Sequence, residues 1–132
     1  MFRSVDCVNI PEGLRYTRQH EWVLIDGESA RIGITDLAQD ALGNIVHVQL
    51  PALGQSVRSG ASAVEVESSK SVSDIYSPVS GSVVLVNESL ATQPGLVNSD
   101  PYGSGWLYEV QMSYDETLEG LLSASEYRAI VS

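Results

Sequence analysis

The chain is poor in the residues that build metal centres and disulfide frameworks. Its 132 residues include one cysteine, Cys7, and two histidines, His20 and His47. A single cysteine cannot close an internal disulfide, and such usage is typical of a reducing compartment. There is no Cys/His cluster with zinc-site spacing, no glycine-rich phosphate loop and no serine nucleophile elbow. This thin inventory indicates a protein that catalyses nothing by itself.

Long apolar runs and positive charge are also scarce. No apolar stretch approaches the length needed to span a membrane, and the first residues lack the apolar segment of a secretory signal. With 17 acidic and 7 basic residues, the formal net charge is -10. This balance argues against binding to nucleic acid or to anionic membranes, and it favours basic partner surfaces. Because no convincing leader precedes residues 11–13, we expect a protein of the bacterial cytoplasm.

Lysine occurs once. Arginine fills every other basic position, so Lys70 carries the one side-chain amine of the chain. Arginine stays protonated and is a poor nucleophile, whereas a lysine amine can lose a proton and form an amide. A single amine at one position suggests a site for covalent attachment of a carried group. On the count alone, the alternative that Lys70 merely occupies a turn stays open.

Alternating apolar and polar residues predict a chain of short strands. The length and the 43% hydrophobic content are typical of a single globular domain, here residues 1–132. Turns rich in Gly, Pro and Ser separate the predicted strands, which are residues 20–26, 30–35, 45–50, 63–67, 72–76, 82–86 and 106–110. Such spacing predicts a mainly β fold, a sandwich or a flattened barrel.

The strand at residues 45–50 also predicts where one histidine points. A period of two places Val46, Val48 and Leu50 on one face and His47 on the other. His47 is therefore interpreted as a surface histidine.

Helical signals are few and lie at the edges of the β pattern. Thr35 is placed to cap a short helix over residues 37–42, and Gly43 is placed to end it. Residues 115–131 form a second helical segment, weakened by Gly120, in which residues 123–126 have the pattern of a capping box. Residues 1–11 are expected to be flexible.

The strand pattern places Lys70 at the tip of a hairpin. Predicted strands precede and follow it, and residues 68, 69 and 71 are serines, which leave room for a modifying enzyme. Glu65, Glu67 and Asp74 surround the amine with carboxylates. Nearby negative charge keeps an amine protonated, so the site is expected to resist random acylation.

The sequence around this lysine resembles the lipoyl-lysine segment of glycine cleavage system H proteins. That segment is residues 66–81, VESSKSVSDIYSPVSG. Further matches follow the same order along the chain and cover about residues 12–130: YT at 16–17, HEW at 20–22, GITD at 33–36, AQ at 38–39, LG at 42–43, LVNSDPYG at 96–103, GW at 105–106, LLSA at 121–124 and EY at 126–127.

The resemblance implies a non-catalytic lipoyl carrier with a hybrid barrel-sandwich fold, a short internal helix and C-terminal helices. Lipoate would be amide-linked to Lys70. In that family it takes an aminomethyl group from a pyridoxal-phosphate glycine decarboxylase and passes it to a tetrahydrofolate-dependent aminomethyltransferase. A dihydrolipoamide dehydrogenase then reoxidises the dithiol. The chemistry belongs to the cofactor and the partner enzymes.

The resemblance also assigns roles to four further positions. Glu67 and Gly54 match positions used for recognition by lipoyl-attaching enzymes. Glu21 and Asp74 are expected to face the arm and to pair with the ammonium that it carries. For these two carboxylates, the alternative of a solvated strand face remains open.

Other uses of the same lysine are not separated by the sequence. One is an H-like lipoyl carrier that serves lipoate relay or another pathway. A biotin carrier is a poorer match, because its lysine lies between methionines and serines flank Lys70 here. A last alternative, from another class, is an unmodified acidic module that docks a basic partner.

Overall fold

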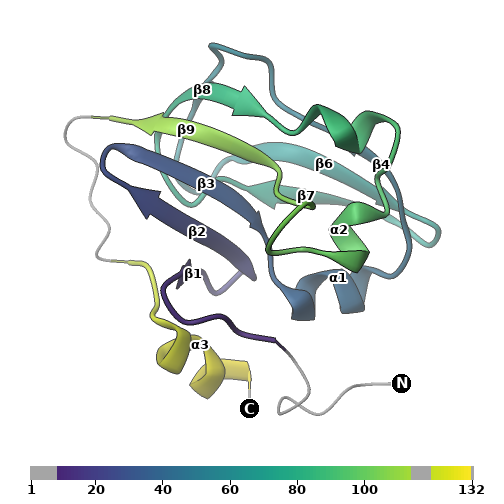
Figure 1. The fold of residues 1–132 in the computed structure, drawn as a ribbon, viewed down its shortest axis with the longest axis horizontal. Helices are drawn as coiled ribbons and strands as arrows, with labels where there is room; N and C mark the ends of the chain where they lie inside the picture. Colours follow the sequence, from purple (N-terminus) through teal and green to yellow (C-terminus); the bar gives the residue numbers. More distant parts are fainter. Residues whose placement is uncertain (1–8, 114–119, 132) are drawn as a thin grey trace.

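Two antiparallel sheets form the body of the protein (Figure 1). The structure, a computed structural model, describes residues 9–113 and 120–131. The larger sheet contains, in spatial order, β1 (Arg15–Tyr16), β2 (Glu21–Asp26), β3 (Ser29–Ile34), β9 (Tyr108–Met112), β8 (Gly81–Val86) and β5 (Ser56–Val57). The smaller sheet contains β4 (Ile45–Gln49), β6 (Ser62–Ser68) and β7 (Val72–Tyr76). The predicted mainly β fold is confirmed.

Within the described residues, four short helices lie at the ends of the sheets. They are α1 (Asp36–Leu42), the 3-10 helix η2 (Glu88–Ala91), α2 (Leu96–Ser99) and α3 (Ala124–Val131). Helices α1 and α2 lie together at one end, while α3 lies beyond β1 (Figure 1). The predicted Thr35 cap is confirmed, because its Oγ1 accepts the Ala38 N–H at 3.2 Å. The sequence analysis missed η2 and α2, because four residues are too few to show helical periodicity.

The core lies between the two sheets. Both contribute aliphatic side chains to one buried cluster, including Val23, Ile32, Val66, Val83 and Val110. Shared burial of two sheet faces is the defining property of a sandwich. A second cluster under α3 includes Tyr16 and Tyr127, whose rings stack with centroids 4.8 Å apart.

Residues 9–11 pack against the body of the protein. Ile10 is 5% exposed. The Asn9 N–H donates to Asp36 Oδ2 at 3.0 Å, and the Tyr16 hydroxyl donates to the Pro11 carbonyl at 2.6 Å. The first of these hydrogen bonds joins residues 27 positions apart, whereas the second is local. The rest of the segment predicted to be flexible, residues 1–8, lies outside the described residues.

The C-terminal prediction is correct in part. Ser123 and Glu126 form the predicted capping box: the Ser123 N–H donates to Oε1 at 2.8 Å, and the Glu126 N–H donates to the serine Oγ at 3.1 Å. The helix begins at Ala124. The prediction of a helix at Leu122 is wrong, because this residue forms a β-bridge with Tyr16. Residues 115–119 of the predicted segment lie outside the described part.

A register shift changes which side chains of β4 are buried. The shift lies between Ile45 and His47, where β4 pairs with β6. Ile45 and Val48 are buried as a result, whereas Val46 is 45% exposed. The predicted exposure of His47 is confirmed. The prediction that Val46 and Val48 share a face is wrong, because a bulge interrupts the period of two.

Candidate functional site

The single lysine lies at the crest of the β6–β7 hairpin. The two strands pair in antiparallel register up to Glu67 and Val72, and Lys70 is exposed in the turn between them. Paired strands hold the backbone of a turn while its side chains face solvent. The predicted place of the lysine is therefore confirmed.

Ser68 closes the turn around the lysine. Its hydroxyl oxygen accepts hydrogen bonds from the backbone N–H of Lys70 at 3.2 Å and from that of Ser71 at 3.1 Å. The same hydroxyl donates to the Ser71 carbonyl at 3.2 Å. Ser68 is 5% exposed, so it organises the turn rather than widening access to it. This role was missed. A serine that opens a turn is the signal that points to it, since its hydroxyl can bond backbone groups two and three residues on.

The corner between α1 and β4 supports the same turn. The Ser69 N–H donates to the Asn44 carbonyl at 3.0 Å. A Cβ built on Gly43 would lie 3.1 Å from Lys70 Cε and 3.5 Å from Nζ. The lysine side chain therefore lies against the backbone at the C-terminal end of α1, where glycine leaves room for it.

Three predicted acidic residues lie on the exposed face of the smaller sheet. Glu67 pairs with His47 on β4 and with Val72 on β7. Glu65 lies directly opposite Asp74, which accepts a hydrogen bond from the Ser62 hydroxyl at 3.0 Å. Like charges in direct register cost stability, and solvent exposure limits that cost. The lysine hairpin is thus an acidic surface with one amine at its end.

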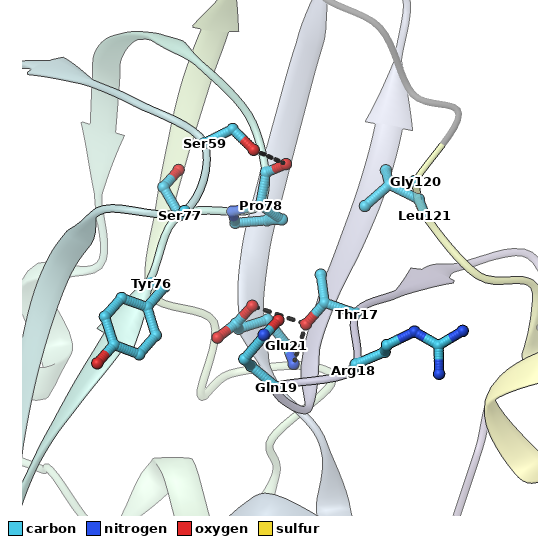
Figure 2. A pocket seen from close by; sticks show the side chains of 11 residues that line it. Thr17, Arg18, Gln19, Glu21, Ser59, Tyr76, Ser77, Pro78, Gly120 and Leu121 are labelled. Carbon is cyan, nitrogen blue, oxygen red and sulfur yellow. Dashed lines mark hydrogen bonds between the residues drawn. The ribbon is translucent and has the colours of Figure 1, made fainter. Parts of the chain in front are cut away.

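Glu21 is buried in the wall of a cavity. The cavity has a volume of about 610 Å³ and lies where the start of β2, the end of β7 and residues 120–121 meet (Figure 2). Glu21 is 2% exposed, and the Thr17 hydroxyl donates to its Oε1 at 2.7 Å. The Glu21 N–H donates back to the Thr17 Oγ1 at 3.1 Å, so the carboxylate is held in one orientation.

The environment of Glu21 favours its neutral form. Burial raises the pKa of this carboxyl above its ordinary value, while hydrogen bonds from the Thr17 hydroxyl and the Tyr76 backbone oppose the rise. A cation placed in the cavity would stabilise the ionised form. A cation that approaches this carboxylate from the cavity, which Arg18 also lines, would restore the charge balance that burial removes.

The predicted site residues are only partly brought together. Asp74 does not line the Glu21 cavity; it lies with Glu65 in a separate hollow of about 230 Å³. Gly54 lies beside the larger sheet, where its N–H donates to the Val83 carbonyl at 2.7 Å, whereas Glu67 lies on the smaller sheet. Residue spacing does not show this, because it depends on which sheet each segment joins.

The described residues show neither a metal-binding cluster nor a membrane-spanning helix. Within residues 9–113 and 120–131, no three His, Cys, Asp or Glu side chains are grouped to hold a metal ion. None of the described helices is long and apolar enough to cross a membrane.

The sandwich fold and the exposed lysine on a braced hairpin define a carrier domain, which presents an amine to other proteins. The family model described as Glycine cleavage H-protein matches residues 14–132. The chain belongs to this family, and the resemblance seen in the sequence is confirmed.

Relatives and a solved structure agree with that assignment. The chain is 52% identical to the glycine cleavage system H protein of Micrococcus luteus over 126 residues, covering 94% of this chain and 98% of the relative. It is 55% identical to that of Mycolicibacterium smegmatis over 127 residues, covering 93% and 97%. The crystal structure of the H protein from Mycobacterium marinum matches with a TM-score of 0.85 at 44% identity, covering 92% and 98%. The chain is thus a non-catalytic, lipoyl-carrying shuttle protein of glycine cleavage.

Proposed function

We propose that this chain carries lipoate in amide linkage to Lys70 and uses it to move the aminomethyl group from glycine decarboxylase to aminomethyltransferase. The observation that supports this most strongly is the exposure of the chain's single lysine at the crest of β6–β7. Attachment needs a primary amine that an enzyme can reach and a backbone that does not yield on contact. The hairpin meets both needs.

The residues around Lys70 fit the lipoyl group. Ser68 holds the turn, and the small side chains of Ser69 and Ser71 leave the amine accessible. When attached, lipoate supplies a dithiolane that accepts and releases the carried group and cycles between oxidised and reduced forms. The role of the chain is to position this group and to shield what it carries.

Glu21 is the proposed contact for the amine at the end of the loaded arm. Its carboxylate is oriented by Thr17 and lies in a cavity large enough to admit part of the arm. A charge-assisted hydrogen bond from an ammonium to a buried carboxylate is stronger than one made in water. Asp74 is a second proposed contact, and it would meet the arm outside this cavity, at the exposed hollow that it shares with Glu65.

Glu67 and Gly54 are the proposed recognition positions for the lipoyl-attaching enzyme. Glu67 is exposed three residues before Lys70, and Gly54 is exposed with a φ of 83°. The further partners are glycine decarboxylase, aminomethyltransferase and dihydrolipoamide dehydrogenase. The proposed location is the bacterial cytoplasm, since the relatives described above come from bacteria.

Intact mass tests the attachment. The wild-type chain is incubated with lipoate, ATP and a bacterial lipoate-attaching enzyme, and Lys70→Arg serves as the matched control because it keeps the positive charge without an amide-forming amine. We expect one lipoyl group on the wild type and none on the variant. An unmodified wild type would instead favour the acidic binding module.

Reconstitution tests the pathway. The lipoylated chain is mixed with glycine decarboxylase, and exchange of labelled bicarbonate into glycine is followed. We expect exchange with lipoylated wild type and only background with Lys70→Arg. A lipoylated chain that supports no exchange would point to lipoate relay or another lipoyl-dependent pathway.

A further inference from the structure

We propose that Asn98 is a positioning residue that fixes the presentation of Lys70, although it lies 28 positions away in the sequence. The inference rests on the proposed attachment of lipoate to Lys70. It assigns a role to one residue of the segment 96–103, which the sequence marks by its pattern alone.

Asn98 joins three parts of the α1–β4 corner with one side-chain amide. Its Nδ2 donates to the Gly43 carbonyl at 2.8 Å and to Gln39 Oε1 at 3.0 Å. Its Oδ1 accepts the Ile45 N–H at 2.8 Å. A backbone N–H bonds only to the amide oxygen, so this last contact sets which way the amide faces. The side chain thereby holds the backbone on both sides of Asn44.

The corner that Asn98 holds touches the lysine turn twice. The Asn44 carbonyl accepts the Ser69 N–H at 3.0 Å. Gly43 lies against the Lys70 side chain, because a Cβ added to Gly43 would lie 3.1 Å from Lys70 Cε. The remaining bonds of the turn come from Ser68, which belongs to the hairpin itself. Asn44 and Gly43 therefore extend the link between hairpin and body beyond the last β4–β6 pair, Ile45 with Ser68, to the crest itself, and Asn98 positions both.

This brace determines how stiffly the amine is presented. A hairpin crest held only by its own strands moves with the ends of those strands, whereas one bonded to a helix corner has a fixed direction. An attaching enzyme binds a preorganised turn at a lower entropic penalty than a mobile one. We therefore expect loss of the Asn98 donors to slow attachment of lipoate more than it lowers the stability of the fold.

The test variant is Asn98→Asp, which keeps the shape and the acceptor for Ile45 but replaces both donors. The matched control is Asn87→Asp. Asn87 also uses its Nδ2 to bridge two carbonyls, those of Ser104 at 2.7 Å and Trp106 at 2.8 Å, and it makes no described contact with the corner or the lysine turn. Asn98→Ala is included as a second variant, since it removes the donors without adding a charge.

Two readouts are compared at a temperature where all variants are folded. Hydrogen exchange by NMR reports the protection of the Ser69 amide, with Val66 in the same hairpin as internal reference. Initial rates of lipoylation are followed by intact mass. We expect Asn98→Asp and Asn98→Ala to lower Ser69 protection about tenfold relative to Val66 and to lower the kcat/KM of attachment about fivefold or more, whereas Asn87→Asp changes neither.

The outcomes separate this proposal from the one on which it rests. If wild type is not lipoylated, the proposed function fails first. If wild type is lipoylated but both Asn98 variants match Asn87→Asp in Ser69 protection and in rate, the brace is refuted. If lower stability alone explained the slower attachment, Asn87→Asp would lower the rate of lipoylation as much as an Asn98 variant of equal stability does. This result would also refute the proposal.

Discussion

Glu21 shows how a single residue can be costly for folding and suited to function. It is a carboxyl group at 2% exposure whose described partners are a threonine hydroxyl and a backbone N–H. Desolvation penalises its ionised form. An ammonium in the adjacent cavity would offset that penalty, so the same feature that weakens the empty fold would favour the proposed contact with a loaded arm.

The pH dependence of stability follows from this burial. Because the folded state raises the Glu21 pKa above its ordinary value of 4.5, the folded protein holds this proton more tightly than the unfolded chain. The contribution of Glu21 is therefore most favourable below that value and declines as pH rises through the folded pKa. Gln cannot titrate, so we expect the Tm difference between Glu21→Gln and wild type to shift in favour of the variant from about pH 4 to about pH 7.

Thermal unfolding monitored by circular dichroism measures this difference. Glu65→Gln, on the exposed face of β6, controls for the general loss of one negative charge. A Tm difference for Glu21→Gln that stays constant over this range, or moves toward the wild type, would contradict the inference.

At the scale of elements, α1 connects the two clusters of buried side chains and the lysine turn. Its N-cap, Thr35, is fully buried, and its Oγ1 lies 2.9 Å from the hydroxyl of Tyr127 on α3. Its C-cap, Gly43, lies against Lys70 and is held by Asn98. A seven-residue helix is marginal by itself, so its ends determine where it sits.

Removing the Thr35 hydroxyl is expected to destabilise the fold. Thr35→Ala loses the cap on the Ala38 N–H and leaves the Tyr127 hydroxyl with one partner fewer. We expect the free energy of unfolding in urea to fall by about 1–3 kcal/mol. Thr35→Ser keeps the hydroxyl and should lie within about 1 kcal/mol of wild type. Equal losses for the two variants would show that the methyl group, not the hydroxyl, is responsible.

Gly43 provides a second prediction for the same helix. It has a φ of 84°. Gly13 is the matched control, because it has a similar φ of 88° but no atom lies within 4 Å of a Cβ added there. Alanine at either position should lower the free energy of unfolding by about 1–3 kcal/mol, because both backbones disfavour a side chain. Only Gly43→Ala meets Lys70, so only this variant should slow lipoylation. Equal rates for the two variants would contradict the contact.

At the scale of the whole molecule, the charge distribution is strongly acidic. The net charge is -10, and Glu65, Glu67 and Asp74 are exposed on the sheet that carries Lys70. Such a field raises the encounter rate with a basic partner surface, and salt weakens it.

Ionic strength is therefore expected to slow the attachment of lipoate. Raising salt from about 50 mM to about 500 mM shortens the Debye length by roughly threefold, and the initial rate should fall several-fold. Lipoate activation by the enzyme alone, measured at both salt concentrations, controls for effects on the enzyme. Glu67→Gln should show a weaker salt dependence, and a rate unaffected by salt would argue against electrostatic steering.

Local pattern was enough for the parts of the fold that depend on neighbouring residues. Alternation predicted the strands on both sides of Lys70, and the Thr35 cap and the 123–126 capping box followed from their spacing. It was not enough at β4, where the bulge between Ile45 and His47 depends on pairing with β6. Nor did it predict the packing of Ile10, whose partners lie elsewhere in the chain.

The sequence by itself determined that one amine exists and that it stands at the crest of a hairpin, because turn chemistry and strand alternation act over a few residues. Only the tertiary structure decided that Glu21 lines a cavity, that Asp74 lies outside it, and that Asn98 holds the corner under Lys70. The physical reason is distance along the chain: these contacts join segments tens of residues apart, and burial between two sheets determines which of them meet.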